Sequence, residues 1–262
     1  MSQTTAALLG ALAGLTVFVG LPVARLRGLK PTTQCFLNAI ATGVLVFILW
    51  DILAHAGEPL DAALATMRKG NPSTFVLLAL IFAGGLGLGL LSLVYFNGRV
   101  LRRRAETAGA ASPKVLSMMI ATGLGLHNLS EGLAIGQSAA TGAVAFAGVL
   151  VIGFALHNIT EGFGIAAPLS AARDQVSWGF IGMAGLIGGG PTFIGTVIGY
   201  VVVSRYAYVL FLAVAAGALI YVINELFAVG RRLSKPPALA WGLLLGFLAA
   251  YSTDLLLTYL AL

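Results

Sequence analysis

The sequence predicts an all-α, polytopic membrane protein with eight transmembrane helices. The chain has 262 residues and is 59% hydrophobic but only 9% charged, whereas soluble domains carry about 25% charged residues. Its apolar residues fall into eight runs of about twenty residues or more, the length that crosses the hydrocarbon core of a bilayer. The 34 glycines suit close packing of such helices, because small residues let helix backbones approach one another.

The predicted helices follow one another with short connections and form a single transmembrane domain, residues 1–262. In order, they cover residues 5–24, 34–55, 73–98, 115–140, 142–168, 177–203, 206–229 and 238–261. We interpret the first run as a retained helix and not as a signal peptide, because its positive charges follow the apolar run. The connection at 139–142 is so short that the fourth and fifth helices must be adjacent and antiparallel, as in an inverted repeat.

The distribution of basic residues predicts that both termini lie outside. Lys and Arg gather in the loops that face the cytoplasm, and with the N-terminus outside those loops hold twelve of the fifteen basic residues. These are Arg25, Arg27, Lys30, Arg99, Arg102, Arg103, Arg104, Lys114, Arg173, Arg231, Arg232 and Lys235, against Arg68, Lys69 and Arg205 on the outer side. The basic run 99–104 is therefore assigned to membrane orientation, and no nucleic-acid partner is expected.

Two other features exclude classes of site. The single cysteine, Cys35, rules out an intrachain disulfide and a thiolate metal cage. The glycine-rich stretches 84–89 and 182–190 have no preceding strand and no following Lys-Ser/Thr, so they are not phosphate loops. We expect them to pack helices closely, with a bend near Pro191.

The candidate site is a motif that occurs twice, as LHNLSEG at 126–132 and LHNITEG at 156–162, in the fourth and fifth predicted helices. Ionisable residues at membrane depth are costly and usually mark a pathway or a site. Residues i and i+4 share one helix face, so each motif presents its His, Asn and Glu together. The antiparallel pair then brings together His127, Asn128, Glu131, His157, Asn158 and Glu161.

Imidazoles and carboxylates favour a divalent ion such as Zn²⁺, Fe²⁺ or Mn²⁺, and the lack of thiolates disfavours Cu(I). The alternative is that each His and Glu only fastens helices by hydrogen bonding. That alternative is disfavoured because the same His, Asn, Glu and Gly recur at matching positions of two adjacent helices.

Three further acids lie within predicted helices. Glu225 falls in the cytoplasmic half of the seventh helix, whereas Asp51 and Asp254 fall in the outer half and could line an ion pathway. Alternatively, both aspartates reach the outer interface or bond a neighbouring hydroxyl. His55, at the expected outer end of the second helix, is interpreted as an interfacial residue.

The paired motifs resemble those of the ZIP family of divalent metal transporters, as do the eight-helix plan and the stretch AGALIYVINE at 216–225. The resemblance implies a binuclear centre and transport from outside into the cytoplasm. It implies one site from His127, Glu131, His157 and Glu161, and a second from Asn128, Asn158 and Glu225 that shares the two motif glutamates. The family commonly has proline before the motif glutamate, where this chain has Ser130 and Thr160. Their hydroxyls are expected to bond back to the i−4 carbonyl and to bend the helix mildly. The loop at 99–114 lacks the family's histidine cluster, so no metal-sensing loop is expected.

We therefore predict a transporter, not an enzyme, that moves divalent metal ions into the cytoplasm by alternating access. Zn²⁺ is the first expected substrate, and Fe²⁺, Mn²⁺ and Cd²⁺ are alternatives. The rivals are a metal-binding receptor or scaffold without flux, and an intramembrane metallohydrolase. The hydrolase is disfavoured because the chain has no HExxH and each Glu is needed as a ligand. The expected location is a bacterial inner membrane, where the lipid bilayer is the partner of the chain. The sequence leaves open whether the protein forms a homodimer, whether protons are coupled to transport and whether it works as a channel.

Overall fold

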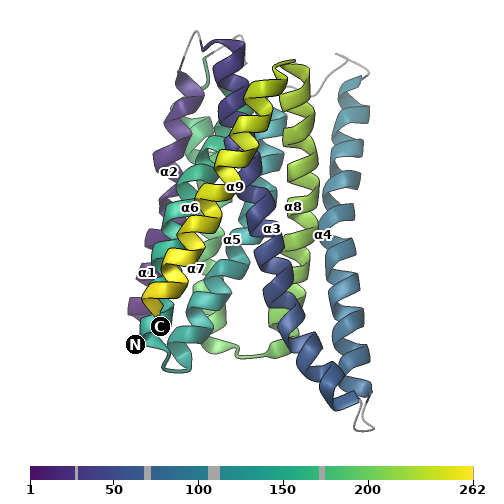
Figure 1. The fold of residues 1–262 in the computed structure, drawn as a ribbon, viewed down its shortest axis with the longest axis vertical. Helices are drawn as coiled ribbons and strands as arrows, with labels where there is room; N and C mark the ends of the chain where they lie inside the picture. The colour runs from purple at the N-terminus through teal and green to yellow at the C-terminus, as the bar shows by residue number, and fades with distance from the viewer. Residues whose placement is uncertain (27–28, 68–71, 106–112, 171–174, 262) are drawn as a thin grey trace.

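The computed structural model describes residues 1–26, 29–67, 72–105, 113–170 and 175–261, and that part of the chain forms helices and no strand. The helices run along the long axis of a single bundle, with both chain ends at the same end of it (Figure 1). They are α1 (Gln3–Leu15), α2 (Val17–Gly20), η1 (Leu21–Arg25), α3 (Pro31–Met67), α4 (Ser73–Ala105), α5 (Pro113–Ala140), α6 (Val144–Ser170), α7 (Trp178–Val201), α8 (Arg205–Arg232) and α9 (Pro236–Ala261). The predicted all-α fold is confirmed.

The first crossing is interrupted, because α1, α2 and η1 follow one another within Gln3–Arg25. Among the described residues, seven helices are long and apolar enough to cross a membrane, and α5 is the long helix that falls outside this set. More than half of the residues of α5 are buried, and α5 packs against α6, α7 and α8. A helix enclosed by other helices meets little lipid, so it can carry polar residues that a lipid-facing helix excludes.

The predicted end of the second helix was wrong. The expected range ended at 55, but α3 continues to Met67 with Pro59 inside it. The extension is rich in Ala and Leu, which favour a helix, and one proline removes only one backbone hydrogen bond. His55 is therefore an internal helical residue and not the end of a helix.

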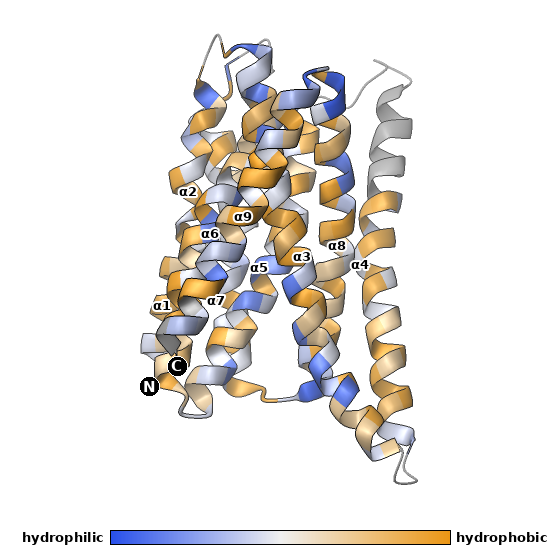
Figure 2. Cartoon of the chain, viewed as in Figure 1, coloured by the Kyte–Doolittle hydropathy of each residue, from blue (hydrophilic) through white to orange (hydrophobic). Residues whose placement is uncertain are grey.

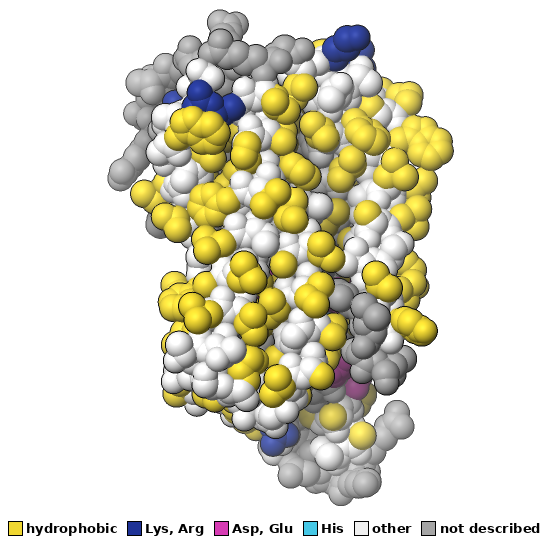
Figure 3. All heavy atoms as spheres, turned by 90° about the vertical axis from the view of Figure 1, so that its left-hand side faces the viewer, with side chains coloured by type: hydrophobic (Ala, Val, Ile, Leu, Met, Phe, Trp, Pro, Cys, Tyr) yellow, Lys and Arg dark blue, Asp and Glu magenta, His cyan; other side chains and the backbone are white. Residues whose placement is uncertain are grey.

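The surface pattern fits a membrane-embedded bundle. Apolar residues dominate most helices along their length (Figure 2), and on the face drawn in Figure 3 the Lys and Arg side chains lie only toward the two ends. Of the residues behind the predicted orientation, Arg27, Arg68, Lys69 and Arg173 lie outside the described residues, as do the side chains at 99–104.

Two glycine features fix the positions of the motif helices. Gly142 has a φ of 86°, in the left-handed region that glycine adopts without strain, so the chain turns there between the end of α5 at Ala140 and the start of α6 at Val144. Farther along, a Cβ atom at Gly132 would overlap the Thr192 carbonyl of α7, and one at Gly195 would overlap the Leu129 carbonyl of α5. The close backbone approach at Gly132 and Gly195 thus holds α5 against α7 at its motif.

Candidate metal centre

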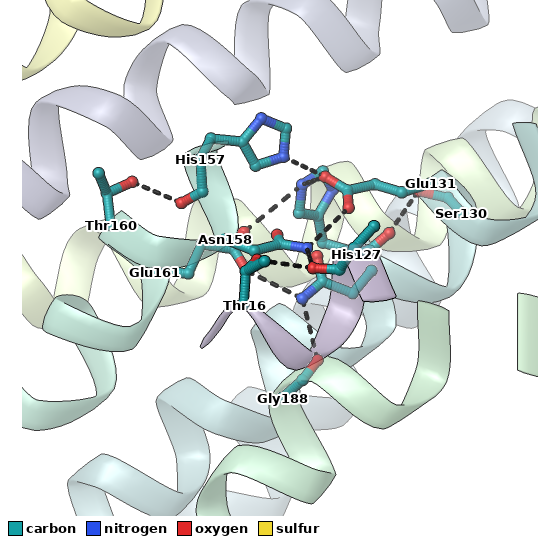
Figure 4. Close-up of polar contacts among 11 residues, drawn as sticks. Thr16, His127, Ser130, Glu131, His157, Asn158, Thr160, Glu161 and Gly188 are labelled. Atoms are coloured by element: carbon teal, nitrogen blue, oxygen red, sulfur yellow. Dashed lines mark hydrogen bonds and ion pairs between the residues drawn. The ribbon is translucent and has the colours of Figure 1, made fainter. Parts of the chain in front are cut away.

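Four side chains from the two motifs converge inside the bundle. His127 and Glu131 lie one turn apart on α5, and His157 and Glu161 lie one turn apart on α6. One ligand atom from each of the four lies within 4.8 Å of all the others. The group is buried except for His157, whose side chain is 19% exposed. Figure 4 shows the two motifs facing one another across this small volume.

Both histidines meet the carboxylates through their Nε2 atoms. His127 Nε2 lies 3.0 Å from Glu131 Oε1 and 3.6 Å from Glu161 Oε1, and His157 Nε2 pairs with the same Oε1 of Glu131. The two rings are stacked, with centroids 6.1 Å apart. Apart from these ion-pair contacts, His127 Nε2 and Glu161 Oε1 have no hydrogen-bond partner among the described residues, and His127 Nδ1 has none either. One carboxylate oxygen from each glutamate and one ring nitrogen from each histidine thus converge, and such a set of nitrogen and oxygen donors suits a divalent cation.

The two motif asparagines stand next to this cluster with their amide nitrogens, not their oxygens, toward the carboxylates. Asn128 Nδ2 donates to Glu161 Oε2 at 2.9 Å, and Asn158 Nδ2 donates to Glu131 Oε2 at 3.5 Å. Both side chains are fully buried, and neither Oδ1 has a hydrogen-bond partner among the described residues. The prediction that these oxygens ligate a metal ion stays a prediction.

The residues that replace the usual prolines bond back to the motif histidines. The Ser130 hydroxyl donates to the His127 carbonyl, and the Thr160 hydroxyl donates to the His157 carbonyl, each at 2.6 Å. The acceptor is therefore the i−3 carbonyl, and the expected i−4 acceptor was wrong. In both helices the hydroxyl group thus binds the backbone of the same residue that offers its ring to the cluster.

A cavity of about 820 Å³ extends from the cluster toward the end of the bundle where α5 turns into α6. Both predicted pathway residues, Asp51 and Asp254, line it together with His55 and Glu58. His55 Nδ1 lies 3.2 Å from Asp51 Oδ1. His55, which the sequence analysis interpreted as an interfacial residue, thus also lines the cavity. The sequence already indicated that residues 51, 55 and 58 lie together, because their spacing places them on one face of a helix.

Glu225 is not part of this group. It is half-buried on α8, and neither the four-residue cluster nor the wall of the cavity includes it. Its predicted role as a ligand for a second ion therefore stays a prediction.

Fold and cluster define a helical membrane protein that gathers metal-ligating side chains inside its bundle. The sequence model of the ZIP Zinc transporter family matches residues 99–250, more than half of the chain and the part that contains both motifs. The chain belongs to the ZIP zinc transporter family, as the resemblance of its motifs predicted. Among curated proteins, none matches the chain significantly. The family transports divalent metal ions, so this integral membrane protein is a divalent metal transporter of a family of transporters, not of enzymes.

Proposed function

We propose that the protein carries Zn²⁺ into the cytoplasm through a site formed by His127, Glu131, His157 and Glu161. Fe²⁺, Mn²⁺ and Cd²⁺ are the alternative substrates. The observation that carries the proposal is the convergence of four ligand atoms within 4.8 Å in the buried centre of the bundle. Two imidazoles and two carboxylates supply the four nitrogen and oxygen ligands that Zn²⁺ takes in tetrahedral sites.

The charges of this site match its proposed cargo. Two ionised glutamates balance a divalent cation, and neutral imidazoles add ligands without adding charge. Buried charges are tolerated when they are paired or coordinate a metal. Nitrogen and oxygen ligands without thiolates also permit exchange, which a transported ion needs because it must leave the site again.

The cavity supports access from the end of the bundle that holds both termini. We propose that this end faces outside, because the described basic residues cluster at the other end, where η1 and α8 finish. Asp51 and Asp254 on the cavity wall would raise the local concentration of cations, since clefts lined by one sign of charge attract the opposite sign. We assign the protein to a bacterial inner membrane, in keeping with its small size.

Uptake into proteoliposomes tests this function. Purified protein is reconstituted, and the flux of Zn²⁺, Mn²⁺, Fe²⁺ and Cd²⁺ is compared between the native chain and the double variant His127→Ala/His157→Ala. We expect saturable flux for the native chain and background flux for the variant, because the variant loses both nitrogen ligands. Tight metal binding by the native chain without any flux would support the receptor alternative and would overturn the transport proposal.

A further inference from the structure

The cavity ends at the four-residue cluster. On α5 its wall begins at His127 and continues toward the turn into α6. Among the described residues, none of α5 before His127, of α6 after Thr160 or of α8 after Leu212 lines it. The cluster therefore lies at the closed end of the cavity, and side chains fill the bundle between the cluster and the end that we propose faces the cytoplasm.

The side chains on that side of the cluster are apolar. One connected core includes residues of α5, α6 and α8 that are at most 1% exposed, among them Ile120, Leu124, Ile165, Leu219 and Val222. A charged group without partners is costly in such surroundings, and apolar constrictions close a route to ions because they exclude water. This apolar layer therefore separates the cluster from the cytoplasm.

Within this layer, α5 and α8 meet where Val222 packs on Gly123. A Cβ atom at Gly123 would lie 2.4 Å from Val222 Cγ2, which is closer than side chains approach. The valine does not turn aside easily, because a β-branched side chain is stiff at χ1. Gly123 comes one turn before His127 on α5, and Val222 comes about one turn before Glu225 on α8. The contact thus lies at a level between the cluster and the cytoplasmic end of α8.

We propose that Val222 and Gly123 form the inner gate of the transporter. The valine closes the route beyond the cluster while the cavity is open on the other side. The absent side chain at Gly123 lets the two helices meet without overlap, so the contact can open when the ion moves on. This inference rests on the proposed function, since a gate requires an ion that passes it.

Val222→Thr tests the gate with little change of shape. Threonine resembles valine in outline, but its hydroxyl holds water in the layer or bonds back to the helix. Zn²⁺ uptake into proteoliposomes is measured over a range of concentrations and normalised to folded protein. We expect native uptake to saturate. Uptake by Val222→Thr and Val222→Ala should gain a linear component and run at least about threefold faster than native at high Zn²⁺, because a wetted layer no longer excludes ions. Saturable uptake at the native rate in both variants would overturn the inference.

Val209→Thr and Val209→Ala are the matched controls on the same helix. Val209 is also fully buried, but it belongs to a separate core with Ala63 and Leu78 and does not line the cavity. These variants suffer a similar loss of packing and should keep saturable uptake at the native rate. A linear component as large as that of the Val222 variants would overturn the inference, because it would indicate a general loosening of the bundle.

Gly123→Ala tests the other half of the contact. Its Cβ atom overlaps Val222, so we expect uptake to fall about tenfold or more, and Val222→Ala added to it should restore most of the rate by removing the overlap. Gly164→Ala is the control, since Gly164 is buried on α6 and its Cβ atom would meet only Ala41 Cβ, at 3.6 Å; its uptake should stay near native. Native uptake by Gly123→Ala, or a double variant no faster than Gly123→Ala, would overturn the inference.

The two halves of the experiment support one another. Where a Gly123 variant does not fold, the Val222 variants decide, and the reverse holds as well. A native chain without saturable Zn²⁺ flux would overturn the proposed function, and this inference with it. Saturable native flux that the changes at Val222 and Gly123 leave unaltered would overturn only the gate.

Discussion

Replacing Glu131 with glutamine is expected to lower metal uptake by at least about 100-fold, which corresponds to about 2.7 kcal/mol. Glu131 contacts both histidines of the cluster through one oxygen, so it is the carboxylate that joins the two motifs. Glutamine keeps the shape and removes the charge. In a buried site of low dielectric, one charge next to a cation contributes several kcal/mol, so the loss is large although the change is small.

Asp61→Asn provides the control for this experiment. Asp61 is exposed near the end of α3 and does not line the cavity, so its neutralisation should leave uptake within about twofold of native. Uptake is measured with Zn²⁺ in proteoliposomes and normalised to the amount of folded protein. Native uptake by Glu131→Gln would rule out the four-residue site.

A thiol placed in the cavity is expected to make transport almost completely sensitive to modification. Ala134 follows Glu131 by one turn of α5 and lines the cavity. Cys35 is buried and is the sole cysteine of the chain, so background labelling is small. After Ala134→Cys, reaction with a bulky, membrane-impermeant thiol reagent should reduce uptake about tenfold or more, because the attached group occupies the cavity beside the cluster.

Ala140→Cys is the matched control on the same helix. Ala140 is exposed at the end of α5 and is not among the residues that line the cavity. It should react readily while uptake stays near native. Labelling at Ala134→Cys should also slow when Zn²⁺ is present, because the ion occupies the neighbouring cluster. Full labelling at Ala134→Cys without loss of uptake would show that the cavity is not the route.

The sequence predicted those parts of the structure that depend on a single physical cause, such as the thickness of the bilayer. Apolar runs predicted the helices within a few residues, because the bilayer dictates their length. The exceptions are the ends of α3 and α4, at Met67 and Ala105, which lie beyond the predicted ends at 55 and 98 and outside the apolar runs. The apolar run 115–140 predicted α5 (Pro113–Ala140), and the motif repeated on α6 indicated where on α5 the site lies.

The details of the site depend on packing that no local pattern contains. The motif spacing brought His127, Glu131, His157 and Glu161 together, as observed. The direction of the Asn128 amide depends on the Gly188 carbonyl, which is distant in sequence and is contributed by α7.

X-ray absorption at the zinc edge of the native protein loaded with one equivalent of Zn²⁺ tests the central claim most directly. The site predicts four nitrogen and oxygen ligands at about 2.0–2.1 Å, with the multiple scattering of two imidazoles and no sulfur. In His127→Ala/His157→Ala that imidazole signal should vanish. A native first shell of oxygen alone, without imidazole, would contradict the assignment of the two motifs as the metal site.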